Sequence, residues 1–148
     1  MVVAKEFPLF KVDDKCIKHV EQFKYLGHII TNTLTDVDDI NSEIKKMFVR
    51  ITNMLIRKFH NCSTDVKIML FKTFCICLYN VALWKTFKIV TLNKFRLCYN
   101  KCIKLFFSFC YKRRDSVTNV LLVLGLPSFD MLLHNCNLRF TALLSNVK

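Results

Sequence analysis

Carboxylates, histidines and cysteines at short spacings are the first candidates for chemistry in this sequence. Two adjacent acidic pairs, Asp13-Asp14 and Asp38-Asp39, carry the oxygen ligands that divalent cations use. His60-Asn-Cys62 and His134-Asn-Cys136 have the residue types of zinc ligands, but one intervening residue is shorter than the usual ligand spacing. Adjacent aspartates are far more often turn or helix-start residues. The sequence therefore predicts no metal site.

Basic side chains are the second candidate, because they attract phosphates. The formal net charge is +12, and residues 45–114 hold 16 basic side chains and one acidic one. On the helix expected from Ile40 to Phe59, four polar residues fall within about 60° of one another, nearly opposite the apolar face. They are Lys46, Arg50, Asn53 and Arg57. This face has no acid after Glu43, so it suggests a surface that binds the phosphates of nucleic acid or of anionic lipid. The alternative is an ordinary solvated helix face.

The apolar content of 53% raises the question of a membrane span. The longest uncharged runs, residues 73–84 and 116–129, have 12 and 14 residues, whereas a spanning helix needs about 18 to 20. No membrane span is predicted. Lys5, Glu6 and Pro8 stand where a signal peptide would be apolar, so we expect an intracellular protein of the nucleus or cytoplasm. The eight cysteines contain no C-x-x-C pair and are interpreted as free thiols.

The elements that position these groups are predicted to be mainly α-helical, since glycine and proline number only two each. Residues 9–12 and 15–17 are expected to form a β-hairpin around Asp13-Asp14. Phe23–Ile30 is expected to be a third strand, with Gly27 at a bulge or a close backbone approach. These strands make up a first region, residues 1–34, and a bundle of about five helices makes up a second, residues 35–148.

Apolar periodicity and cap residues place the helices of this bundle. They are expected at Ile40–Phe59, Thr64–Lys85, Thr91–Phe106, Ser116–Gly125 and Phe129–Leu144. Asp36, Asp38 and Asp39 are expected to cap the first helix. The second helix is apolar on almost every side and is predicted to be the buried centre. The third is predicted to bury Leu92, Phe95, Tyr99, Cys102, Ile103 and Phe106 and to point Lys94, Lys101 and Lys104 away from the core.

The segment Phe23-Lys24-Tyr25-Leu26-Gly27-His28-Ile29-Ile30 resembles the F-x-Y-L-G primer grip of non-LTR (LINE-type, jockey-like) retrotransposon reverse transcriptases. Further segments follow that family in order over nearly the whole chain. They are Asp36–Asp39, Ile40 with Glu43 and Ile44, Lys67 to Cys75, Leu78-Tyr79, Leu83-Trp84, and Leu92 to Asn100. The resemblance implies the end of an RNA-directed DNA polymerase, running from the last palm strands through the thumb and the helices beyond.

The resemblance also implies roles for particular residues. Tyr25, Leu26 and Gly27 would press on the primer backbone near its 3′ end, with glycine permitting close approach. The helix Ile40–Phe59 would be a thumb helix lying along the duplex of RNA template and DNA primer, with its basic face on phosphates and sugars rather than on bases. A wider cationic track would include Lys94, Lys101, Lys104, Lys112, Arg113 and Arg114.

The catalytic aspartates of the family, one on an earlier palm strand and two in an aromatic-x-Asp-Asp box, are absent from this sequence. In the complete polymerase they hold two magnesium ions. We therefore expect no catalytic residue, no cofactor and no polymerase activity from this chain alone, and apolar surfaces exposed by the missing palm and fingers. Two other functions remain open: a helical protein-interaction module, and a peripheral membrane protein whose basic helices lie on anionic lipid.

Overall fold

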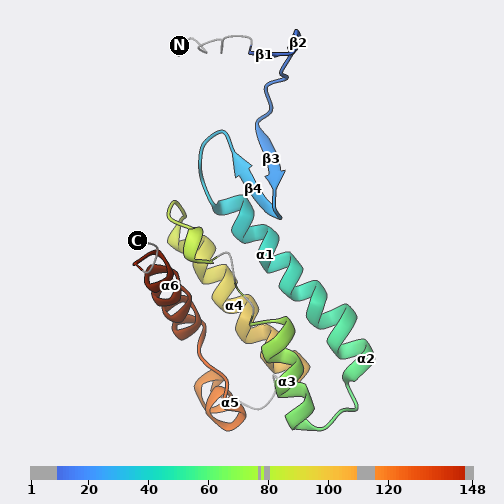
Figure 1. Cartoon of the computed structure of the whole chain (residues 1–148). Coiled ribbons are helices and arrows are strands. Elements are labelled where there is room, and N and C mark those ends of the chain that lie inside the picture. Colours follow the sequence, from blue (N-terminus) through green and yellow to red (C-terminus); the bar gives the residue numbers. More distant parts are fainter. Residues whose placement is uncertain (1–9, 77, 79–80, 110–115, 146–148) are drawn as a thin grey trace.

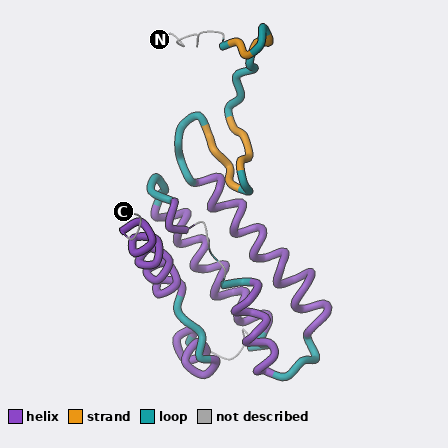
Figure 2. Tube along the Cα trace, in the orientation of Figure 1, coloured by secondary structure: helices purple, strands orange, loops and turns teal. Residues whose placement is uncertain are grey.

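The computed structural model describes residues 10–76, 78, 81–109 and 116–145. The chain is mainly helical with two antiparallel strand pairs before the helices, which confirms the predicted fold class (Figure 2). The strands are β1 (Lys11–Val12), β2 (Lys15–Cys16), β3 (Gln22–Tyr25) and β4 (His28–Thr31). The helices are α1 (Val37–Val49), the π-helix η1 (Arg50–Ile56), α2 (Arg57–Phe59), α3 (Thr64–Phe74), the 3-10 helix η2 (Val81–Leu83), α4 (Ile89–Phe106), α5 (Val117–Leu124) and α6 (Phe129–Ser145).

The first long helix is one rod made of α1, η1 and α2 (Figure 1). Its buried residues Met47, Ile51 and Leu55 are four positions apart. Four residues of an α-helix turn through about 400°. Side chains four positions apart would therefore shift around the helix axis by about 40° at each step. The wider π-helical turn of η1 reduces that shift and keeps the buried side chains on one side.

The central helix is α4, which lies between the α1–α2 rod and α6 (Figure 1). Its predicted core face is confirmed for Phe95, Tyr99, Cys102, Ile103 and Phe106, while Leu92 is only partly buried. Aromatic rings from three helices pack on one another there. The ring centroids are 5.0 Å apart for Phe95 and Phe129, 5.9 Å for Tyr99 and Phe129, and 6.0 Å for Phe71 and Tyr99.

The predicted helix Thr64–Lys85 is wrong beyond Phe74, where α3 ends. It is also not the buried centre, because Phe71 is the fully buried residue of α3 and Met69 is 64% exposed. A straight helix that is apolar on every side could not turn all its faces to one core. The break after Phe74 lets Cys75, Leu78, Val81 and Trp84 be buried in turn as the chain runs past α6.

The predicted single strand Phe23–Ile30 is also wrong, because the segment folds back on itself. Strands β3 and β4 are antiparallel, with Tyr25 opposite His28 and Phe23 opposite Ile30. The two turn residues, Leu26 and Gly27, have φ values of 47° and 90°. A two-residue loop with both φ values positive matches the right-handed twist of a hairpin.

The earlier hairpin is confirmed, with β1 paired to β2 around Asp13 (φ 48°) and Asp14 (φ 59°). It stands away from the helices, whereas β3 and β4 lie at the start of α1 (Figure 1).

Polar residues or glycine occupy cap positions of α1, α3 and α5. Gly125 ends α5 in the left-handed conformation at φ 58°, as its position predicted. Ser63 and Ser116 occupy the N-cap positions of α3 and α5, but neither side chain makes a cap hydrogen bond. Asp36 occupies the N-cap position of α1 without capping it. Its Oδ2 instead accepts hydrogen bonds from the backbone of Lys85 and Thr86, at 2.8 and 2.7 Å.

None of the described helices alone is long and apolar enough to cross a bilayer. The α5–α6 pair reaches that length and composition only when joined, and it is bent by 59°.

Candidate nucleic-acid interface

The turn of the β3–β4 hairpin projects two large side chains into solvent. Tyr25 is 59% exposed and Leu26 is 83% exposed. Gly27 has open space around its α-carbon, with no heavy atom within 4 Å of where a Cβ would lie. These are the three residues that the primer-grip resemblance singles out, and the turn leaves all of them accessible to a ligand.

Lys46 joins this turn to the α1–α2 rod. Its Nζ donates to the backbone oxygen of Gly27 at 3.3 Å and to Oε1 of Glu43 at 2.5 Å. Glu43 is 8% exposed, and Lys46 is half-buried. The predicted phosphate ligand Lys46 is therefore partly neutralised, and it positions the turn beside the basic face of the rod.

The other three residues of that face lie further along the rod. Nη1 of Arg50 points to the backbone oxygen of Phe74 at 3.5 Å, a long hydrogen bond to the end of α3. Asn53 and Arg57 are exposed. On this face, Lys46 and Arg50 near the hairpin are hydrogen-bonded to other parts of the chain, whereas Asn53 and Arg57 are exposed to solvent. We call these four residues the basic stripe.

The basic residues of α4 form a separate group. Nζ of Lys101 lies 5.9 Å above the ring of Phe48, while Lys94 is exposed and Lys104 is partly buried. Phe48 is two positions from Arg50, which places it about 160° around the rod from the basic stripe. The structure therefore does not bring Lys101 into one track with the stripe. Lys112, Arg113 and Arg114 lie outside the described residues.

The carboxylate of Asp39 holds the hairpin and the segment after α3 against the rod. Oδ2 accepts from Nδ1 of His28 and from Nε1 of Trp84, both at 2.9 Å, and Oδ1 accepts from the backbone N–H of Ile29 at 3.1 Å. Burial raises the pKa of Asp39, but the hydrogen bonds from Trp84, His28 and Ile29 outweigh it and leave the pKa below its usual value. We call these residues the Asp39 cluster.

This cluster corrects the expected capping role of the aspartates. The sequence singled out Asp39 as a helix-start residue and missed its partners, because Trp84 is 45 positions away. Asp38, its neighbour, is exposed. No local pattern in the sequence marks such a contact, because His28 and Trp84 both stand in largely apolar segments.

The acidic pairs do not fit the magnesium ions of a polymerase. Asp13 and Asp14 are both exposed in a two-residue turn. Asp39 faces the protein interior while Asp38 faces solvent. Across the part of the chain that the structure describes, no three His, Cys, Asp or Glu side chains lie close enough together to hold a metal ion. No catalytic step is therefore assigned to these carboxylates.

No family model, curated protein or solved structure matches this chain.

Proposed function

We propose that this chain holds a duplex of RNA template and DNA primer through phosphate contacts, as the primer-grip and thumb part of a non-LTR retrotransposon reverse transcriptase. The proposal starts from the resemblance of Phe23–Ile30 and the later segments to that family. The chemistry of synthesis belongs to palm aspartates that this sequence does not contain.

The observation that carries the proposal is the hydrogen bond from Lys46 Nζ to the oxygen of Gly27. It ties the exposed turn to the last turn of α1, part of a rod whose outward face is basic. A duplex seated along that helix would have its backbone along Asn53 and Arg57 and its end beside Tyr25 and Leu26. Contacts to phosphates and sugars carry no sequence information, as a polymerase that moves along its template requires.

Exposure decides which residues supply the affinity. Arg57 and Asn53 are free to reach phosphates, whereas Lys46 is already paired with Glu43. Arginine gives bidentate contacts to phosphate oxygens, so Arg57 is the main phosphate ligand of the proposal. Lys46 acts mainly by positioning the turn.

A binding assay against an RNA–DNA hybrid tests the proposal. We expect affinity to fall steeply with salt, because each neutralised phosphate releases counterions. Arg57→Glu should weaken binding at least tenfold without changing the fold, since the side chain is exposed. Lys88→Glu is the matched control: it makes the same charge change before α4, two residues from Thr86, which is hydrogen-bonded to Asp36 at the opposite end of the rod from Arg57.

Anionic vesicles provide the competing outcome. If the chain bound vesicles of phosphatidylserine and phosphatidylcholine more tightly than the hybrid at the same salt, the membrane alternative would replace the proposal. If Arg57→Glu and Lys88→Glu weakened hybrid binding equally, the affinity would come from net charge alone and the thumb assignment would be wrong.

A further inference from the structure

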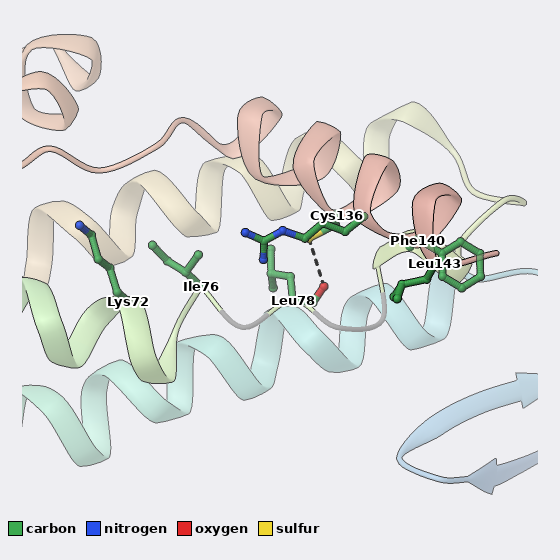
Figure 3. Close-up of a pocket in the computed structure, with 8 residues that line it drawn as sticks. Lys72, Ile76, Leu78, Cys136, Phe140 and Leu143 are labelled. Atoms are coloured by element: carbon green, nitrogen blue, oxygen red, sulfur yellow. Dashed lines mark hydrogen bonds between the residues drawn. The ribbon is translucent and has the colours of Figure 1, made fainter. Parts of the chain in front are cut away.

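A pocket of about 420 Å³ lies between the end of α3 and the face of α6, away from the residues of the proposed duplex site (Figure 3). One wall is formed by Lys72 and Ile76 together with Leu78, and the other by Phe140 and Leu143 of α6. Its size falls in the range of small-molecule sites, which are mainly apolar with a few polar groups.

The pocket continues into a second hollow of about 340 Å³. The two share Lys72, Ile76, Cys136 and Arg139, so they form one groove with these residues at its middle. The second hollow adds the amide side chain of Asn135. The positive charges of the groove are therefore concentrated where the two hollows meet.

The pocket has a charged end and an apolar end. Figure 3 shows Lys72 at one end, Phe140 and Leu143 at the other, and Leu78 between them. Among the described residues that line either hollow, the charged side chains are Lys72 and Arg139, and none is acidic. This arrangement is complementary to a molecule with one anionic head and an apolar tail.

We propose that this groove binds a medium-chain aliphatic carboxylic acid. The carboxylate lies at the junction of the two hollows, where the Arg139 guanidinium donates to it in a bidentate pair and Lys72 adds a second positive charge. The alkyl chain runs along Leu78 toward Phe140 and Leu143. The proposal does not depend on duplex binding, since the groove and the basic stripe share no residue.

The thiol of Cys136 lines the groove, so its reactivity can show whether a ligand is bound there. Its Sγ donates to the backbone oxygen of Leu78 at 3.5 Å, across the floor of the pocket (Figure 3). Burial raises the pKa of Cys136, although the positive charge of Arg139 opposes this. A ligand lying over Leu78 would cover this thiol.

Calorimetric titration with sodium hexanoate, octanoate and decanoate, each below its micelle concentration, tests the proposal. We expect one saturable site per chain and an affinity that rises about fourfold per added methylene. Arg139→Gln should weaken decanoate binding about tenfold, because a charge-assisted pair is lost. Lys58→Gln, which removes an exposed positive charge from α2, should leave decanoate binding unchanged.

Two results would overturn the proposal. Equal affinity for decanoate and for decyltrimethylammonium, which has the same tail and a cationic head, would show that the groove does not select an anion. Equal affinity for hexanoate and decanoate would show that the apolar end holds no tail.

Alkylation of the unmodified protein gives a readout that needs no variant. Decanoate should slow the reaction of iodoacetamide with Cys136 about tenfold, as followed by peptide mass spectrometry, and leave Cys62 unchanged. Cys62 is a suitable internal reference because it is a free cysteine in the α2–α3 connection. The same rate at Cys136 with and without decanoate would contradict the assignment.

Discussion

The indole Nε1 of Trp84 donates to Oδ2 of Asp39 at 2.9 Å, joining two residues that are 45 positions apart. Both side chains are buried, at 7% and 3% exposed. The same carboxylate accepts hydrogen bonds from His28 and Ile29 of the hairpin. One side chain thus fixes the segment after α3 and the β3–β4 hairpin to the first turn of α1, and so sets where the turn stands relative to the basic stripe.

Replacing Asp39 by Asn should therefore destabilise the fold. The amide offers one acceptor oxygen where the carboxylate offers two, so a buried donor loses its partner, at a cost of about 2 kcal/mol. Urea unfolding followed by Trp84 fluorescence measures this loss. Asp38→Asn is the control, because Asp38 is the exposed neighbour and should change stability by less than about 0.5 kcal/mol. Equal stabilities of the two variants would contradict the role of the Asp39 cluster.

The lowered pKa of Asp39 predicts a pH dependence of stability. The folded-state pKa lies below the unfolded value of about 3.9, so the carboxylate contributes stability above that pH. This contribution is lost as the pH falls through the folded-state pKa. The difference in unfolding free energy between the wild type and Asp39→Asn should be constant near neutral pH and shrink below about pH 4. A difference that stayed constant to pH 2.5 would contradict the prediction.

The sequence predicted the helices whose apolar faces repeat regularly and failed where a run was apolar throughout. Phe95, Tyr99 and Phe106 recur at helical spacing, and α4 formed as expected. The run from Phe74 to Trp84 has no polar face to signal which side is buried, so periodicity could not place the break. That break depends on contacts with α6 and Asp39, which lie far away along the chain.

Gly27→Ala should destabilise the β3–β4 hairpin, because it strains the backbone of the turn. The φ of 90° disfavours any residue with a Cβ, and no atom stands where that Cβ would be, so the cost is conformational and about 1 kcal/mol. Amide hydrogen exchange of Phe23 and Ile30 should become about fivefold faster. Lys24→Ala, an exposed substitution within β3, should change those rates by less than about twofold. Unchanged exchange in Gly27→Ala would mean that the turn does not need glycine.

The exposed apolar residues of the N-terminal strands predict self-association. Phe23, Tyr25 and Leu26 are 51%, 59% and 83% exposed. Large apolar side chains exposed in this way favour association in water. In sedimentation velocity, the wild type should form oligomers at micromolar concentrations, and the double variant Tyr25→Lys with Leu26→Lys should shift toward monomer. Leu122→Lys, which removes a 76% exposed leucine from α5, should shift it less. A monodisperse wild-type monomer would contradict this prediction.

The sequence predicted which residue types line the candidate interface. It did not predict which of these residues are held by other parts of the chain and which are exposed. Helical spacing predicted that Lys46, Arg50, Asn53 and Arg57 share one face, and in the structure Asn53 and Arg57 are exposed while Lys46 and Arg50 are half-buried. Their unequal availability depends on Gly27 and Phe74, which approach the rod only after the chain has folded. For the same reason, the sequence could not show that Lys101 packs on Phe48, on the far side of the rod from the basic stripe.

The salt dependence of binding to an RNA–DNA hybrid tests the central claim most directly. The slope of log affinity against log salt should be less steep by about 0.9 in Arg57→Gln than in the wild type, because one phosphate contact is lost. Lys88→Gln, with the same change in net charge, should keep the wild-type slope. If all three proteins had the same slope, Arg57 would contact no phosphate and the proposed duplex-holding face would be wrong.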